Sequence, residues 1–294
     1  MLRPFGHTVR FTLSLARPWL SLGPGWAALA GALSTGPRPL SLATWLQLVS
    51  LWLLVDPLLG TLWDLLVEQG LWRRVTRAQL PPPAISGFSL PYAQAGSPAG
   101  RLVICFRRYQ VWWQAQYWPE SGEAVAAAGL GLSLALLLGL FLGPPVFWLT
   151  LLAVGLMVWA GQYVIELTAP GGGRWPTLIQ FVLPWLMGCL LWSGLSPLGL
   201  ALAVCLGSVY LGGLRMMGQH RHADRLFYLG QLAALALLLA LRLLPGAASL
   251  GVLLVAQWLL RARFNQPSDL LPRLQPYLVL GMLVAGLSIG RLAG

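Results

Sequence analysis

The sequence predicts an all-α membrane protein: a polytopic bundle of about nine transmembrane helices. Of its 294 residues, 57% are hydrophobic and only 9% are charged, whereas a water-soluble domain carries about 25% charged residues. The mean hydropathy is +0.71. Long apolar runs, each close to the about 20 residues that a helix needs to cross a bilayer, alternate with short segments rich in Pro, Gly and Arg. We therefore expect residues 1–294 to form a single transmembrane helical domain.

Nine apolar runs have the length of a membrane span. Three of the connections between them are only two or three residues long and consist of Gly, Pro or Ser, so the helices that they join are expected to be antiparallel neighbours. The expected spans cover residues 13–34, 41–66, 122–143, 146–166, 176–195, 197–215, 226–245, 247–264 and 275–292.

The basic residues predict the orientation of the bundle. All 19 are Arg, against eight acids, for a net charge of +11. In a soluble chain this charge would indicate nucleic acid; in a membrane protein, Arg-rich loops favour the cytoplasmic side. With the N-terminus inside, only Arg38, Arg242 and Arg291 lie outside. We expect the lipid bilayer and not nucleic acid as partner, and a prokaryotic plasma membrane with a cytoplasmic N-terminus as the location.

Two acids occupy the cytoplasmic half of the second expected span. Asp56 and Asp64 are eight residues apart, so in a regular α-helix they share approximately one face. Charges inside hydrocarbon are costly and therefore indicate function. One interpretation is that these carboxylates hold a divalent cation. The other is that Asp64 lies at the interface and Asp56 pairs with an arginine of a neighbouring helix.

The connection between the sixth and seventh spans contains a second polar group. His220, His222 and Asp224 are close in sequence, which makes a metal site conceivable. The alternative is a solvated turn whose arginines set the topology. The candidate metal ligands of the chain are Asp56, Asp64, His220 and Asp224. Candidates for phosphate or headgroup binding are Arg73, Arg74, Arg77, Arg215, Arg221 and Arg225.

Residues 70–121 form the long non-spanning stretch and are expected to be a cytoplasmic or interfacial loop between spans two and three. Aromatic and arginine side chains favour the headgroup layer of a membrane. We expect this loop to lie in the interface or against a protein partner, unless it is simply an aromatic belt before the third span. The residues that carry this expectation are Phe106, Arg107, Arg108, Tyr109, Trp112, Trp113, Tyr117 and Trp118.

The layout resembles the UbiA superfamily of intramembrane prenyltransferases, in particular its chlorophyll-synthase-like branch. Residues 16–20 (ARPWL) and 27–33 (AALAGAL) are similar to the first helix of that family. Residues 77–87 (RAQLPPPAISG) resemble the family's Arg-Pro-Leu-Pro-Ser-Gly-x-Ile-Ser stretch. The resemblance extends over the whole chain and implies a bundle around an apolar cavity that accepts an isoprenoid chain.

The family's acidic motifs are degenerate here. The resemblance implies N-D-x-x-D-x-x-x-D on the second helix and D-x-x-x-D after the sixth, where carboxylates bind Mg²⁺ and the prenyl diphosphate. The four polar positions of the first motif become Val55, Asp56, Leu59 and Trp63. Asp64 is displaced by one residue, Asp224 alone remains of the second motif, and the chain has no Lys to match the family's catalytic lysines. A diphosphate bound through metal ions needs several carboxylates.

These substitutions favour a non-catalytic UbiA-like subunit, a degenerate prenyltransferase that docks in a larger membrane complex, with a photosynthetic one as an attractive setting. We expect it to hold an isoprenoid-tailed molecule: (bacterio)chlorophyll, carotenoid, quinone or lipid. Axial ligation of a chlorin would fall to Gln162, Gln180, Gln231, Gln257, a backbone carbonyl or water. The alternative is an active Mg²⁺-dependent prenyltransferase that joins a prenyl diphosphate to a chlorin or quinone-precursor acceptor.

Overall fold

The computed structural model describes residues 23–36, 38, 39, 41–71, 97–162, 173–192, 194–218, 220, 222–264 and 267–293. Every regular element in these residues is a helix. Seven of the described helices are long and apolar enough to cross a membrane: Leu42–Glu68, Ser121–Leu142, Pro144–Gln162, Pro197–Met217, Ala223–Ala240, Leu244–Arg263 and Asp269–Leu292. The expectation of an all-α, membrane-embedded chain is confirmed by these helices.

Each of the nine expected spans contains helix in the residues that the structure describes, and seven of these helices are long and apolar enough to be candidate spans. In chain order the helices are α2 (Pro24–Leu33), α3 (Leu42–Leu53), η2 (Leu54–Leu58), α4 (Leu59–Trp63), η3 (Asp64–Glu68), α6 (Pro98–Trp112), η4 (Trp113–Tyr117), α7 (Trp118–Leu142), α8 (Pro144–Gln162), α9 (Arg174–Thr177), η6 (Leu178–Val182), α10 (Leu183–Leu190), α11 (Pro197–Met217), α12 (Ala223–Ala240), α13 (Leu244–Arg263) and α14 (Pro267–Ala293). The η segments are π-helical turns. Two expected spans, 13–34 and 176–195, correspond to α2 and to α9–η6–α10, whose described lengths fall short of the seven others.

The short helix α2 is the central element of the bundle. Its small residues are buried on all sides, with Ala27, Ala28, Ala30 and Ala32 at 0% exposure. Small residues let helix backbones approach closely in membrane bundles. A Cβ atom added at Gly188 of α10 would collide with the Ala28 carbonyl oxygen. On its other side α2 contacts α14, so it is enclosed between two neighbouring helices.

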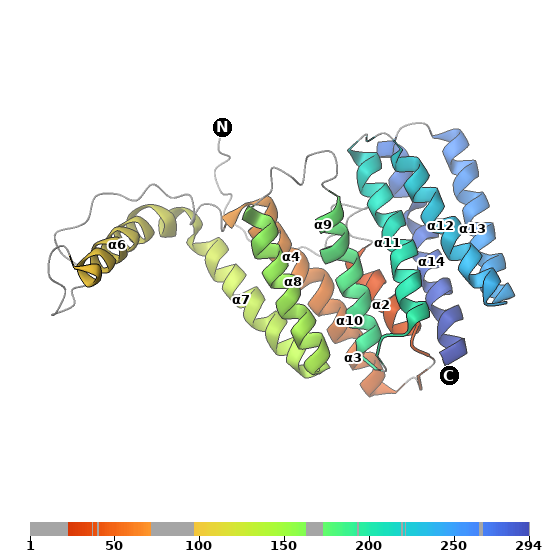
Figure 1. Ribbon diagram of the computed structural model, residues 1–294, viewed down its shortest axis with the longest axis horizontal. Helices are drawn as coiled ribbons and strands as arrows, with labels where there is room; N and C mark the ends of the chain where they lie inside the picture. Colours follow the sequence, from red (N-terminus) through yellow and green to blue (C-terminus); the bar gives the residue numbers. More distant parts are fainter. Residues whose placement is uncertain are drawn as a thin grey trace.

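Two hydrophobic cores flank this central helix. One lies among α3 to α4, α7 and α8, and we call these helices the N-terminal half. The other lies among α11, α12, α13 and α14, which we call the C-terminal half. Helices α2 and α10 contribute to both cores. Figure 1 shows α7 and α8 on one side of the molecule and α12 and α13 on the other.

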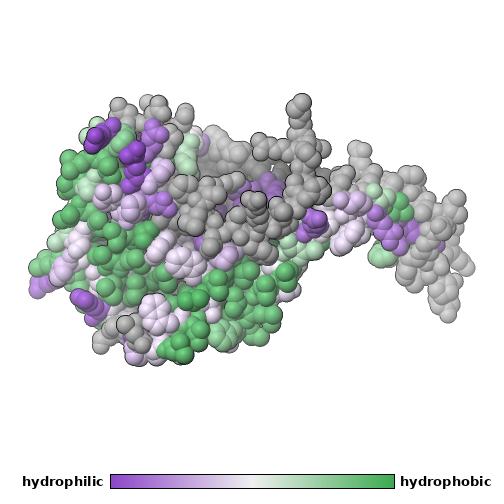
Figure 2. Space-filling view, turned by 180° about the vertical axis from the view of Figure 1, so that it is seen from behind, coloured by the Kyte–Doolittle hydropathy of each residue, from purple (hydrophilic) through white to green (hydrophobic). Residues whose placement is uncertain are grey.

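The outer surface of the bundle is strongly apolar. Large hydrophobic side chains such as Trp148 (67% exposed) and Val252 (69% exposed) point outward, as expected where lipid surrounds a protein. On the face seen in Figure 2, hydrophobic residues form broad patches on the bundle. Arginines occur at the helix ends: Arg174, Arg215, Arg225, Arg261, Arg263 and Arg273 belong to one end of the bundle, and Arg242 and Arg291 to the other.

The stretch expected as a loop over 70–121 is helical in the part that the structure describes. Helix α6 continues through the π-helical turn η4 into α7 without interruption. Residues 72–96 lie outside the described residues. In Figure 1, α6 extends sideways from the first turns of α7 and away from the bundle. We call α6 and η4 together the arm.

Candidate functional site

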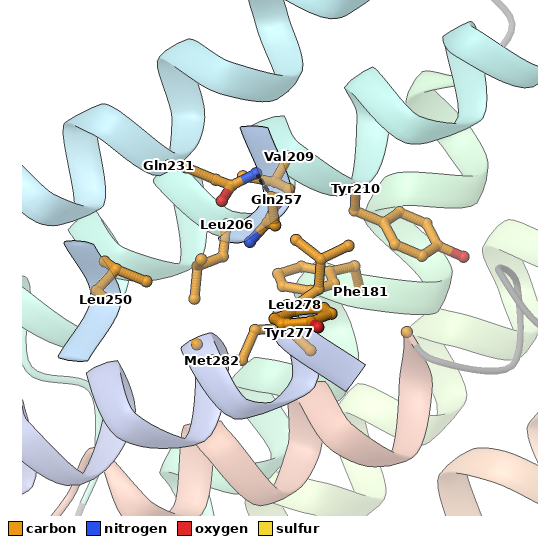
Figure 3. A pocket seen from close by; sticks show the side chains of 12 residues that line it. Phe181, Leu206, Val209, Tyr210, Gln231, Leu250, Gln257, Tyr277, Leu278 and Met282 are labelled. Carbon is orange, nitrogen blue, oxygen red and sulfur yellow. Dashed lines mark hydrogen bonds between the residues drawn. The ribbon is translucent and has the colours of Figure 1, made fainter. Parts of the chain in front are cut away.

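A pocket with about 460 Å³ of empty space, part of it open to the exterior, lies in the C-terminal half. Helices α11, α12, α13, α14 and η6 provide its walls, and Gly23 lies at its edge. Its walls include the apolar side chains Phe181, Leu206, Val209, Leu250, Leu278 and Met282 (Figure 3).

The polar side chains in the described lining are two glutamines and the tyrosines Tyr210 and Tyr277, and the glutamines are bonded to each other. The Gln231 amide Nε2 donates a 3.0 Å hydrogen bond to Oε1 of Gln257. Both side chains are almost fully buried, at 2% and 1% exposure. Buried amides need partners because an unpaired one costs about 1–3 kcal/mol. The bond links α12 to α13 across the wall of the pocket, and Figure 3 shows both amides beside Leu206 and Val209.

The aromatic side of the pocket is held by a second hydrogen bond. The rings of Phe181 and Tyr210 are stacked with centroids 5.5 Å apart. The Tyr210 hydroxyl donates to Oε1 of Gln180 at 2.9 Å, and Figure 3 shows this hydroxyl directed away from the other lining side chains. Tyr210 therefore presents its ring, not its hydroxyl, to the pocket. Of the glutamines considered for chlorin ligation, Gln180 is thus engaged outside the cavity.

An ion pair joins the same two helices, α12 and α13, nearer their Arg-rich ends. Arg261 Nη2 donates to Asp224 Oδ2 at 2.5 Å. Asp224 lies seven residues before Gln231 on α12, or about 10 Å along a helix axis at 1.5 Å per residue. The Tyr228 hydroxyl, between these two levels, is buried without a hydrogen-bond partner. One carboxylate oxygen of Asp224, a candidate metal ligand, is thus engaged by an arginine.

The structure does not bring the four candidate metal ligands together. Asp56 belongs to η2 in the N-terminal half, whereas in the C-terminal half His220 lies between α11 and α12 and Asp224 lies in the first turn of α12. Within the described ranges there is no group of three or more His, Cys, Asp or Glu side chains placed to hold a metal ion. Asp64 is exposed whereas Asp56 is buried. The π-helical turn η2, which contains Asp56, contributes to this difference, because a π turn takes an additional residue and rotates the later residues of the helix relative to a regular α-helix.

Asp56 itself is an unusual residue for a membrane core. It lies fourteen residues after Leu42 and twelve before Glu68, near the middle of that span. It is 6% exposed, and its Oδ1 atom has no hydrogen-bond partner. The Trp52 indole, whose ring meets that of Trp26 edge to face at 5.0 Å, hydrogen-bonds the Asp56 side chain. The pairing of Asp56 with an arginine, which the sequence offered as one interpretation, is not seen among the described side chains.

The arm contains the aromatic and arginine residues that the sequence singled out. Phe106, Arg108, Tyr109 and Trp118 are exposed, Arg107 and Trp113 are half-buried, and Trp112 and Tyr117 are buried. The buried pair anchors the arm. Its ring centroids lie 4.8 Å apart, and the Tyr117 hydroxyl donates to the Leu71 carbonyl at 3.3 Å.

The candidate phosphate ligands are only partly visible. Arg73, Arg74, Arg77 and Arg221 lie outside the described residues. Arg215 lies in the last turn of α11 and Arg225 in the first turn of α12, so these two share one end of the bundle. Neither belongs to the described lining of the pocket.

The sequence indicated Gln231 and Gln257 as separate candidates and did not identify them as a pair. Their spacing could have predicted the pair. Gln231 lies thirteen residues before Leu244, where α13 begins, and Gln257 lies thirteen residues after it. In an antiparallel helical hairpin such residues lie at the same depth. Asp224 and Arg261 lie twenty and seventeen residues from Leu244, so equal spacing does not predict their contact, and the sequence did not indicate it either.

No family model matches the chain, and no curated protein or solved structure is significantly similar to it. The candidate site is therefore defined by its own geometry. That geometry is an apolar pocket with one buried pair of amides in a membrane-embedded helical bundle.

Proposed function

We propose that this protein is a non-catalytic, UbiA-like integral membrane subunit that holds an isoprenoid-tailed pigment, quinone or lipid and docks in a larger membrane complex, such as a photosynthetic one. In this proposal nine spans cross a prokaryotic plasma membrane and the N-terminus is cytoplasmic. The observation that carries the proposal is the apolar pocket among α11, α12, α13 and α14.

The chemistry of the pocket favours an apolar chain. Leu206, Leu250 and Leu278 present aliphatic surface to it, and Phe181 adds an aromatic wall. Burial of such surface contributes about 25 cal/mol per Å² of apolar area removed from water. A long isoprenoid tail provides much apolar area and few polar atoms. It therefore suits this lining better than a sugar, a nucleotide or an ion does.

The separation of the acids supports a role without catalysis. Departure of a diphosphate requires metal ions held by several carboxylates. Asp56 lies in the half of the bundle opposite the pocket, Asp64 is exposed, and Asp224 is paired with Arg261. None of these residues belongs to the described lining of the pocket.

The arm provides a surface for docking. Leu102 (71% exposed) and Phe106 (58% exposed) present apolar surface outside the bundle, near the exposed Arg101 and Arg108. Aromatic and arginine side chains are enriched where proteins bind one another. The hydrogen bond from the Tyr117 hydroxyl to the Leu71 carbonyl anchors the end of the arm that continues into α7.

Purification from native membranes in a mild detergent would test the proposal. We expect extraction of the pure protein to release a stoichiometric isoprenoid-tailed molecule, detectable by absorption and mass spectrometry. We also expect a partner subunit that is lost in the F106A/R108Q variant of the arm but retained in a W148A/V252A control. A colourless preparation of single chains without an isoprenoid would contradict the proposal.

A transferase assay tests the enzymatic alternative. The purified protein is incubated with Mg²⁺, a prenyl diphosphate and a chlorin or quinone-precursor acceptor. We expect no product. Turnover that disappears in Asp56→Ala or Asp224→Ala, while the protein remains folded, would show that a reduced metal site is active.

A further inference from the structure

The buried glutamine pair has hydrogen-bonding groups to spare. A glutamine amide offers two N–H donors and an oxygen acceptor, and the bond between Gln231 and Gln257 uses one donor of the first and the acceptor of the second. The amide nitrogen of Gln257 and the amide oxygen of Gln231 remain. Interchanging the ends of both amides would reverse the bond and still leave one nitrogen and one oxygen. In either arrangement the pair can bind a further polar group.

Both residues line the pocket, so the unused groups are available to whatever occupies it. Neither glutamine has a described polar atom that is both inaccessible and without a hydrogen-bond partner. Figure 3 shows the amide of Gln257 extending from α13 toward the space beside Leu206 and Leu278. The polar end of a ligand can therefore reach the pair while its apolar part contacts the leucines.

The described lining contains no charged side chain. Transfer of an isolated charge from water into an apolar site is very costly unless an opposite charge accompanies it. A diphosphate or carboxylate therefore has no counter-charge at this level of the bundle. A carbonyl or hydroxyl group is different, because an amide donor or acceptor satisfies it fully.

We propose that the pocket recognises the uncharged polar end, a hydroxyl or carbonyl, of an isoprenoid through the Gln231–Gln257 pair, and discriminates against both the bare hydrocarbon and the diphosphate. This inference rests on the proposed function, since it assigns the polar group of the ligand that the pocket holds. It adds a selection rule: the pocket binds an isoprenoid alcohol or quinone-type head and not an activated prenyl donor.

The test compares three probes that share one branched carbon skeleton: phytol, phytane and phytyl diphosphate. Native mass spectrometry of the detergent-solubilised protein measures the affinity of each. We expect phytol to bind more tightly than the other two. Loss of one neutral hydrogen bond corresponds to a roughly 2- to 10-fold change in affinity, so phytol should lose about this factor in Q257M while phytane binding is unchanged.

Two further variants keep the test decisive. The double variant Q231M/Q257M leaves no amide without a partner, so it isolates recognition from destabilisation. Gln162→Met, on α8 and outside the described lining, is the matched control and should bind all three probes as the wild type does. Phytane binding in every variant reports that the pocket is intact.

The outcomes separate the two proposals. Equal affinity for phytol and phytane, or a preference that survives in Q231M/Q257M, would overturn the recognition by glutamine and leave the isoprenoid-holding function standing. Tighter binding of phytyl diphosphate than of phytol would also overturn it. If none of the three probes binds the wild-type protein, the proposed function fails and this inference fails with it.

Discussion

The two halves of the bundle treat their buried polar groups differently. In the C-terminal half, Gln231 of α12 bonds to Gln257 of α13 and Asp224 of α12 pairs with Arg261 of α13, although the hydroxyl of Tyr228 is buried without a hydrogen-bond partner. In the N-terminal half, Asp56 lies near the middle of its span with one carboxylate oxygen unpartnered. Pairing stabilises a helical hairpin, whereas an unpaired acid costs stability. The helices of the C-terminal half are thus joined by polar contacts between side chains, whereas Asp56 keeps one unsatisfied oxygen in the core of the N-terminal half.

The largest expected effect concerns the contact that joins the halves. Gly188→Leu would force a side chain into the backbone of α2 at Ala28, and backbone cannot rotate away as a side chain does. Overpacking typically costs about 1–3 kcal/mol and sometimes more, and we expect the upper end or beyond. SDS-induced unfolding in micelles measures it. Gly155→Leu, which meets no atom within 4 Å, should be nearly neutral; equal loss in both variants would refute the tight packing.

Breaking the glutamine pair is expected to be the next largest effect. Gln257→Leu leaves the Gln231 amide buried without its partner, and hydrogen bonds between membrane helices contribute about 0.6–2 kcal/mol. The double variant Q231L/Q257L should recover part of the loss, because no amide then stays unpaired. Unfolding free energies of the four proteins in the cycle measure the coupling. Strict additivity would mean that the two amides do not interact.

Replacing the unpaired acid should have a smaller effect of opposite sign. Asp56→Asn keeps the shape and removes the ionisable group, so the unfolding free energy should stay the same or rise by up to about 1 kcal/mol. This contrasts with the destabilising change in the glutamine pair. A large loss of stability in Asp56→Asn would show that the carboxylate has an essential partner in the folded protein.

The smallest expected effect belongs to the ion pair. The Arg261 and Asp224 side chains are 32% and 48% exposed, so solvent screens their attraction, and exposed pairs contribute about 0.2–1 kcal/mol. Arg261→Gln should lower the unfolding free energy by this amount, and less at high salt. Arg263→Gln on the same helix end is the control. A loss of unfolding free energy well above this range would show that Arg261 makes further stabilising contacts besides the one with Asp224.

Sequence alone predicted the helices well and the site poorly. Length and hydropathy located Leu42–Glu68 and α11 to within a few residues, because a span is defined by a local property, a run of apolar residues. The pocket depends on which helix faces pack together, which is not local. Gln231 and Gln257 stood out as polar residues in apolar spans, but their contact required the register of the hairpin.

The arm and the two acids Asp56 and Asp64 are places where the sequence pattern predicted the wrong local structure. The polar composition of residues 98–112 favoured a loop, yet α6 begins with Ser97 as N-cap and Pro98 in the first turn, a known helix-start pattern. The regular spacing of Asp56 and Asp64 predicted a shared face, but the π-helical turns changed their phase. Apart from Pro57, which lies inside η2, no residue pattern in the sequence predicted those turns.

The measurement that tests the central claim most directly compares two tryptophan variants on α11. Leu206→Trp fills the pocket, whereas Val204→Trp, at a position 68% exposed on the outer surface, does not. Organic extracts of the purified proteins are analysed by liquid chromatography and mass spectrometry. We predict an isoprenoid-tailed molecule in the wild type and in Val204→Trp, and its loss in folded Leu206→Trp. Equal retention in both variants, or no such molecule in the wild type, would contradict the assignment of this pocket as an isoprenoid site.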